Sequence, residues 1–352
     1  MIRFAIGLLF LLLGSGSQAV SKHYLPGTLE GSIHIWGVAD YPVIEPLLQQ
    51  FQKSVSDVDV HYWEFGTKEL EARLRTYPDD MPDLVMSPAM DLQFKLVNDG
   101  FARTYQSSVT EALPNWTTWR NEIYAFAFEP IVMVINTDIL GGIALPRSRE
   151  QLLNLVREKG PLLQGKMGLS DIERVGLGYL TWFHDSQQSR TYGRLLEAFG
   201  SHHAQLYPNS REMLDALRKG EIFIAYNLVG SYALEWSRRY PWIEPIMPTD
   251  YTSVVLRTAF IPAQAQRAEL GSEFLDYLLS EGQQYMAQNV GLIPIVEGIE
   301  GTNSQEALKR RSHGIFRPIP FGLPLLVQTD KAKRSIILDE WRAAMTSDHK
   351  SK

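Results

Sequence analysis

The chain contains no cysteine among its 352 residues. A protein without cysteine forms no disulfide bonds, so its hydrophobic core must hold it together, which is feasible at this length. The absence also excludes a lipid-modified cysteine anchor and a cysteine nucleophile. We therefore expect a protein that is free in its compartment and is stabilised by packing.

Long apolar runs are scarce as well. After residue 19 no segment approaches the roughly 18 consecutive apolar residues of a membrane span. The apolar run at 4–13 follows Arg3 and precedes Ser17 and Ala19, which have the spacing of a signal peptidase site. This pattern predicts a secretory signal peptide at residues 1–19, cleaved near Ala19, and a mature protein in the periplasm. An uncleaved anchor is the alternative.

Enzyme motifs are absent too. The sequence has no G-x-S-x-G, no phosphate-binding P-loop and no H-E-x-x-H. Its eight histidines are scattered, and the adjacent pair His202 and His203 lacks the spacing of a metal site. The net charge of -6 argues against a nucleic-acid partner. The sequence therefore predicts no catalytic residue, no metal site and no cofactor, although a secreted enzyme remains one hypothesis.

The remaining pattern alternates short apolar segments with amphipathic ones. The composition, 45% hydrophobic and 21% charged, is that of a globular protein long enough for two domains. We predict strands at 32–36, 58–63, 83–86, 122–128, 131–136, 166–169, 221–227, 243–246 and 251–261. Helical segments between most of them predict an α/β fold with parallel strands.

The strands and helices form two blocks. We predict a first lobe at 20–128, a second lobe at 129–248, and a return to the first lobe at 249–352 that also carries C-terminal helices. The two strands at 122–128 and 131–136 flank Glu129 and Pro130, where the chain would cross between the lobes.

The segment 221–239 best illustrates the expected binding geometry. An apolar strand at 221–227 leads through a turn with Asn227, Gly230 and Ser231 into a helix. In an open α/β sheet, ligands bind beyond the carboxyl ends of the strands. The first turn of the following helix has free N–H groups at that place.

Similar small or polar residues follow other predicted strands, where they precede helices. Helix N-termini carry a partial positive charge, so together they would favour an anion. The candidates of this kind are Asp40, Thr67, Ser87, Asp171, Gly176, Asn227, Gly230 and Ser231.

Charged and aromatic candidates complete the predicted site. Arg174 would supply a counter-charge, or it would pair locally with Asp171 and Glu173. Trp36, Tyr226 and Tyr232 would form walls, although Trp36 also fits a core position. Glu129 would either contact the ligand or form a hydrogen bond at the hinge between the two lobes.

Several segments together carry a resemblance to a known family: residues 82–87, 90–100, 128–130, 171–179, 226–233 and 278–283. In their order and spacing the chain resembles bacterial extracellular solute-binding proteins of ABC transporters, in the branch of ferric-iron, phosphonate and sugar-phosphate binders. The resemblance covers about residues 33–288. It implies a two-lobed periplasmic binding protein fold (type II-like), with a mixed, mainly parallel sheet in each lobe, helices around it, and crossover strands that allow closure on a ligand.

The resemblance also bears on the ligand. In ferric-binding members adjacent tyrosines coordinate the metal, whereas here Tyr226 is followed by Asn227, and the first loop offers Asp40 and no histidine. We therefore expect a small anionic solute (a sugar phosphate, organophosphate or carboxylate), bound by a monomer that delivers it to an inner-membrane ABC permease. The alternatives are ferric-iron transport and a ligand-sensing role with a membrane sensor kinase.

Overall fold

The computed structural model describes residues 20–76, 80–188 and 190–346. The predicted signal peptide lies outside these residues. The strands are β1 Ser21–Leu25, β2 Ser32–Gly37, β3 Asp59–Glu64, β4 Leu84–Ser87, β5 Thr118–Trp119, β6 Ile123–Asn136, β7 Met167–Ser170, β8 Gln205–Tyr207, β9 Ile224–Val229, β10 Ile243–Ile246, β11 Thr252–Phe260, β12 Ile293–Pro294 and β13 Phe316–Pro318. The longer helices are α1 Tyr41–Ser54, α2 Thr67–Thr76, α3 Met90–Asn98, α5 Arg149–Glu158, α7 Gly176–Gln188, α8 Thr191–Ser201, α9 Ser210–Lys219, α10 Gly230–Arg239, α11 Ala268–Leu279 and α15 Lys331–Thr346. The shorter ones are α4 Ser108–Glu111, α6 Gly160–Leu163, α12 Glu281–Tyr285, α13 Gln305–Arg311 and α14 Pro324–Thr329.

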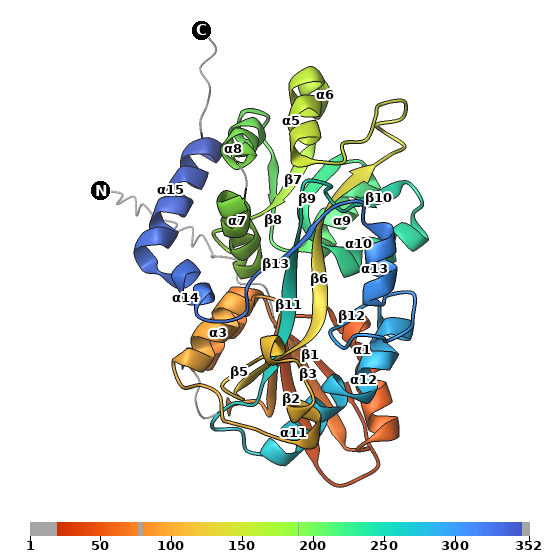
Figure 1. Ribbon diagram of the computed structural model, residues 1–352, viewed down its shortest axis with the longest axis vertical. Helices are drawn as coiled ribbons and strands as arrows, with labels where there is room; N and C mark the ends of the chain where they lie inside the picture. Colours follow the sequence, from red (N-terminus) through yellow and green to blue (C-terminus); the bar gives the residue numbers. More distant parts are fainter. Residues whose placement is uncertain (1–19, 77–79, 189, 347–352) are drawn as a thin grey trace, which may run out of the picture.

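The strands form two groups that share β6 (Figure 1). Strands β1, β3, β2, β4, β11 and the first part of β6 lie side by side in the lower half of the figure, and we call this group with its helices the first lobe. The second part of β6 continues with β9, β7 and β8 in the upper half, which we call the second lobe. The α/β architecture predicted from the sequence is confirmed.

The sheets are mixed. Strands β2, β3 and β4 pair in parallel, as do β9, β7 and β8. Strands β6 and β11 pair antiparallel with each other, and each is also antiparallel to a neighbour in a sheet, β9 and β4 respectively. The predicted parallel arrangement therefore holds for β2–β4 and for β7–β9, whereas the crossover strands and the edge strand β1 run antiparallel to their neighbours.

One strand prediction is wrong at the crossover. The predicted strands 122–128 and 131–136 form a single 14-residue strand, β6, which contains Glu129 and Pro130. Residues up to Pro130 pair with β11, and Ile131 starts the pairing with β9. Because the partner changes at Pro130, its missing N–H interrupts little of the hydrogen bonding. The strand also runs through the predicted lobe boundary at 128, and the domain limits stay a prediction.

Each lobe has its own hydrophobic core. In the first lobe α1, α3 and α11 pack on the central strands through side chains such as Leu47, Phe94 and Phe274, all fully buried. In the second lobe buried side chains of α5, α7 and α8 surround Tyr226 and Trp341. Two separate cores allow the lobes to move as units about the crossover strands.

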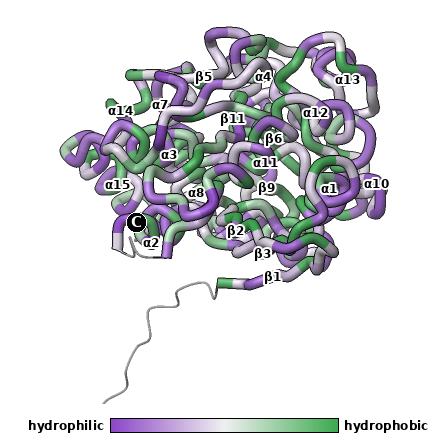
Figure 2. Tube along the Cα trace, turned by 90° about the horizontal axis from the view of Figure 1, so that it is seen from below, coloured by the Kyte–Doolittle hydropathy of each residue, from purple (hydrophilic) through white to green (hydrophobic). Residues whose placement is uncertain are grey.

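The C-terminal segment contacts both lobes. Helix α14 packs on α3 of the first lobe, and α15 packs on α8 of the second lobe. Trp341 on α15 is 1% exposed and belongs to the core of the second lobe. Figures 1 and 2 both place α14 and α15 on the side of the molecule opposite α1 and α10. The C-terminal segment therefore packs on the second lobe as well as on the first.

No helix within the described ranges is long and apolar enough to cross a membrane.

Candidate ligand-binding site

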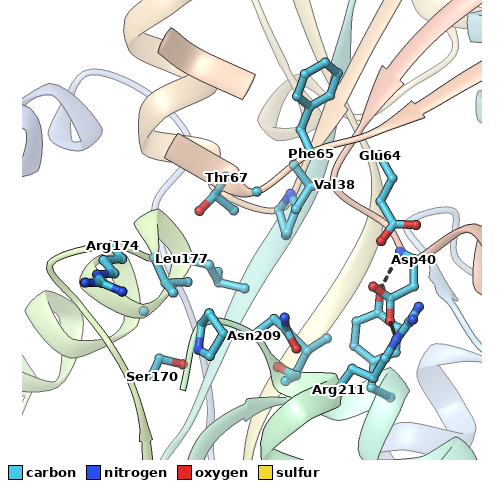
Figure 3. A pocket seen from close by; sticks show the side chains of 18 of the residues that line it. Val38, Asp40, Glu64, Phe65, Thr67, Ser170, Arg174, Leu177, Asn209 and Arg211 are labelled. Carbon is cyan, nitrogen blue, oxygen red and sulfur yellow. Dashed lines mark hydrogen bonds and ion pairs between the residues drawn. The ribbon is translucent and has the colours of Figure 1, made fainter. Parts of the chain in front are cut away.

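A cavity of about 250 Å³ lies between the two lobes. Its lining comes from Val38, Asp40, Glu64, Phe65, Gly66, Thr67, Pro88, Ser170, Arg174, Val175, Leu177, Gly178, Pro208, Asn209, Ser210, Arg211, Asn227, Val229, Tyr232 and Arg257. Figure 3 shows Val38, Glu64 and Thr67 on one side, and Ser170, Asn209 and Arg211 on the other. The cavity thus lies at the ends of strands from both lobes, where an α/β fold binds ligands.

On the side of the first lobe, the first turn of α2 lines the cavity. Gly66 and Thr67 line the cavity, and Thr67 is the first residue of this helix. The Thr67 hydroxyl accepts a hydrogen bond of 2.7 Å from the backbone N–H of Gly176, which begins α7 in the second lobe. Lys68 also donates to the backbone oxygen of Glu173. The two lobes therefore touch beside the cavity.

Arg257 is a lining residue that the sequence interpretation missed. It lies on β11 and is 3% exposed. Its Nε donates to Glu129 Oε1 over 2.6 Å, and its guanidinium lies 5.8 Å from the Tyr232 ring centroid. The available signal was a single charged residue within the otherwise uncharged strand 252–260. A buried cation requires a partner, and Glu129 provides it.

Asp40 precedes α1 and occupies its N-cap position, but its side chain does not cap the helix. Its side chain makes no capping hydrogen bond, and instead it pairs with Arg211 of the second lobe at 2.8 Å. Its backbone N–H donates to the Tyr232 hydroxyl, and burial raises the pKa of Tyr232 to about 12. The N–H of Tyr41 in the first turn of α1 donates to Glu64. Asp40 thus links the lobes rather than completing a helix.

Five of the predicted site residues line the cavity: Asp40, Thr67, Arg174, Asn227 and Tyr232. The Arg174 side chain is 73% exposed and lies 3.5 Å from Asp171. This contact is the local ion pair named as the alternative, although Arg174 also lines the cavity.

Other predicted residues lie next to the cavity without lining it. Ser87 accepts a hydrogen bond from the N–H of Ala89, and Gly176 donates to Thr67. Trp36 is 1% exposed and stacks on Trp63 in the core, so its prediction as a wall of the site is wrong. Strand-end aromatics often have this core position because the ring buries a large apolar area.

The start of α10 differs from the prediction. Strand β9 continues to Val229, and α10 begins directly at Gly230 without the expected turn. The Ser231 hydroxyl donates to Glu129 Oε1 over 2.8 Å, and the Ser231 N–H donates to Glu129 Oε2 over 3.4 Å. The Glu129 carboxylate therefore already occupies the anion position at this helix. Glu129, Gly230 and Ser231 lie behind the cavity lining.

Tyr226 points into the second lobe. Its hydroxyl accepts from Arg149 Nε at 2.7 Å and donates to Asp185 at 2.8 Å, and the residue is 2% exposed. Asn227, at φ 60°, donates from its side chain to the same Asp185. Tyr226 is therefore not a cavity wall. Within the described ranges, no cluster of three or more His, Asp and Glu side chains could hold a metal ion.

Residues 79–312 match the model of a family described as bacterial extracellular solute-binding protein. The chain belongs to this family. The match runs from β4 through α13, so it leaves out β1–β3, α1 and α2 at one end and β13, α14 and α15 at the other. The predicted resemblance is confirmed. A search of curated proteins gives no match.

Solved structures agree with the family. A substrate-binding protein of an ABC transporter from Agrobacterium tumefaciens is 29% identical, with a TM-score of 0.88 over 93% of this chain and 99% of that chain. AfuA from Actinobacillus pleuropneumoniae, with exogenous fructose-6-phosphate bound, is 17% identical, with a TM-score of 0.73 over 90% and 99%. Iron-bound HitA from Pseudomonas aeruginosa is 14% identical, with a TM-score of 0.69 over 89% and 99%. The last two show that the fold is the periplasmic binding protein fold.

Proposed function

We propose that this chain is the periplasmic binding component of an ABC transporter and that it captures a small anionic solute between its lobes. A sugar phosphate, an organophosphate and a carboxylate are the solute classes concerned. The protein acts as a monomer, retains its ligand without converting it, and delivers it to a permease in the inner membrane. The similarity to the Agrobacterium tumefaciens transporter protein supports the transport role.

The main support for an anionic solute is the buried guanidinium of Arg257, which lines the cavity. Glu129 binds its Nε and fixes the side chain, so the guanidinium is held in place before the solute arrives. Guanidinium groups bind phosphates and carboxylates through several N–H donors at once. The first turn of α2 adds its partial positive charge at Gly66 and Thr67.

The cavity volume limits the solute to a small molecule. At about 250 Å³ it lies just below the range of roughly 300–1,000 Å³ found for drug-sized ligands. Asp40, Thr67, Arg174, Asn227 and Tyr232 line the same space and are the residues that we propose contact the solute.

Iron is the competing ligand, because HitA of the same fold has been solved with iron bound. This chain lacks a tyrosine pair at 226–227. The hydroxyl of Tyr226 is hydrogen-bonded to Arg149 and Asp185 instead. A hard trivalent ion requires several anionic oxygens, which this arrangement does not offer.

A thermal-shift panel of phosphate, phosphonates, sugar phosphates, dicarboxylates and ferric ion tests the proposal. A solute at a hundred times its dissociation constant should stabilise the protein by about 2.7 kcal/mol. Stabilisation by an organic anion and none by iron is the expected result. Stabilisation by iron alone would overturn the proposal.

A further inference from the structure

Glu64 is the last residue of β3, and its carboxylate lines the cavity. The side chain is 23% exposed. It accepts a hydrogen bond of 2.8 Å from the N–H of Tyr41, and Nε2 of His23 lies 3.8 Å away. Figure 3 shows Glu64 beside Asp40 and Arg211, away from Thr67 and Arg174 at the other end of the cavity.

The arginines of the cavity are already paired. Arg257 binds Glu129 at 2.6 Å, Arg211 binds Asp40 at 2.8 Å, and Arg174 lies 3.5 Å from Asp171. Each of these cations therefore has a carboxylate next to it, and the positive and negative charges of these pairs largely cancel before a solute binds.

Glu64 differs from these carboxylates. Within the described part of the chain, no lysine or arginine forms an ion pair with it, and the nearby Arg211 directs its Nε to Asp40. Burial raises the pKa of Glu64 and outweighs the opposing effect of the Tyr41 N–H. Asp40 also raises this pKa, whereas the charges of Arg211 and His23 lower it. A partly buried carboxylate with no lysine or arginine within ion-pair distance is costly, and a positive charge on a bound solute would relieve that cost.

We infer that Glu64 binds a positively charged amine of the solute, so that the solute is a small zwitterion with an amine and a phosphate, phosphonate or carboxylate group. This inference rests on the proposed function, because Arg257 and the start of α2 would hold the anionic group. Glu64 is then a specificity-determining residue, since it separates amine-bearing anions from plain anions of the same size.

Isothermal titration calorimetry on the mature chain tests the inference with two matched pairs of probes. Phosphoethanolamine is compared with ethyl phosphate, and β-alanine with propionate. We expect the amine-bearing member of the preferred pair to bind at least tenfold more tightly. Glu64→Gln should remove this preference by weakening the amine-bearing probe, while the plain anion should bind no more weakly than to the wild type. The amide oxygen can still accept the Tyr41 hydrogen bond, and the variant lacks the negative charge that repels an anion.

Glu45→Gln is the control variant, since Glu45 bonds to Tyr41 on the same helix and does not line the cavity. It should keep the full preference for the amine. Equal binding of amine-bearing and plain anions by the wild type would overturn the inference and leave the proposed function intact. Ethanolamine is titrated as a fifth probe without an anionic group, and its binding without any binding of the four anions would overturn the proposed function. No binding of any probe would overturn the inference alone, because the thermal-shift panel tests the proposed function separately.

Discussion

The guanidinium of Arg211 lies 2.8 Å from the carboxylate of Asp40, and this ion pair joins the second lobe to the first across the cavity. Arg211 is on the first turn of α9, whereas Asp40 precedes α1. The Arg211 side chain is 49% exposed, so solvent screens the pair. Such pairs contribute about 0.2–1 kcal/mol, enough to bias a balanced opening equilibrium by up to about fivefold.

We expect Arg211→Gln to shift the unliganded protein towards open forms at low salt. Small-angle X-ray scattering should give a larger radius of gyration for this variant than for the wild type. The difference should shrink in 0.5 M salt because the ion pair is screened. Arg218→Gln is the matched control, since Arg218 pairs with Asp215 within α9. Identical scattering of Arg211→Gln and wild type at low salt would show that the pair does not hold the lobes.

Variants of the Arg257–Glu129 pair should have different effects on stability and on anion binding. Arg257→Gln leaves a buried carboxylate without its cation and should destabilise the protein by about 3–5 kcal/mol. The double variant Arg257→Gln/Glu129→Gln removes both charges and should recover most of this loss. It should nevertheless fail to bind anions, because the guanidinium is missing. Urea unfolding and the thermal-shift panel measure the two effects, and anion binding by the double variant would contradict the role of Arg257.

The packing of α15 on α8 depends on a glycine. A Cβ at Gly200 would lie 2.1 Å from the backbone oxygen of Ala344, which cannot move without shifting α15. Gly200→Ala should therefore destabilise the protein by about 1–3 kcal/mol. On the same helix a Cβ at Gly193 meets nothing within 4 Å, so Gly193→Ala should be neutral or stabilise by up to about 1 kcal/mol. Equal stability of the two variants in urea would contradict the close helix contact.

Asp91 on α3 predicts a pH dependence of stability. It is 1% exposed, neither of its side-chain oxygens has a hydrogen-bond partner from another side chain, and burial raises its pKa to about 7. Between about pH 4 and 7 the folded protein holds a proton at Asp91 that the unfolded chain has lost. Stability therefore falls as the pH rises through this window, by about 1.4 kcal/mol per pH unit at most.

Asp91→Asn should remove this loss. The free energy of unfolding of the variant, measured with urea, should therefore increase relative to that of the wild type between pH 5 and pH 8. Asp99→Asn is a control of opposite sign. Burial raises the pKa of Asp99, but hydrogen bonds from Lys95 and Arg75 outweigh this and lower it. Asp99 therefore stabilises the protein near neutral pH, and this contribution is lost in acid. If Asp91→Asn and the wild type keep a constant difference across the range, Asp91 does not titrate in it.

Local patterns predicted most of the fold. The predicted strands 32–36 and 243–246 became β2 and β10, because strand formation at these places depends on neighbouring residues. The continuous strand β6 was missed because Pro130 normally ends a strand, and its tolerance depends on a change of partner strand. The path of α14 and α15 across both lobes was not predicted, because the packing of α15 depends on the burial of Trp341 among residues distant in the sequence.

The site was harder to predict than the fold. The loops that line the cavity were found because helix starts after strands have a local signature. The residue that caps α10, Glu129, lies 102 positions away from Ser231, and Arg257 lies 128 positions from Glu129. Such partners are fixed by the order of the strands, which no local pattern reveals. The sequence therefore identified loops that line the cavity and named a hinge contact for Glu129 as one of two interpretations, but it did not give the partners of Glu129 and omitted Arg257.

The central claim is that the solute enters only when the lobes separate, and a reversible crosslink tests it most directly. A Cβ on Gly176 would lie 3.4 Å from Cβ of Thr67, close to the separation in disulfides, and only the flexible end of Leu92 must move aside. The natural chain has no cysteine, so Thr67→Cys/Gly176→Cys can form only this bond within one molecule. In calorimetric titration with the anion that gives the largest thermal shift, we expect the oxidised variant to take up no solute and binding to return after reduction with dithiothreitol. If the reduced form binds the anion and the oxidised form binds it equally tightly, capture by closure of the lobes is contradicted.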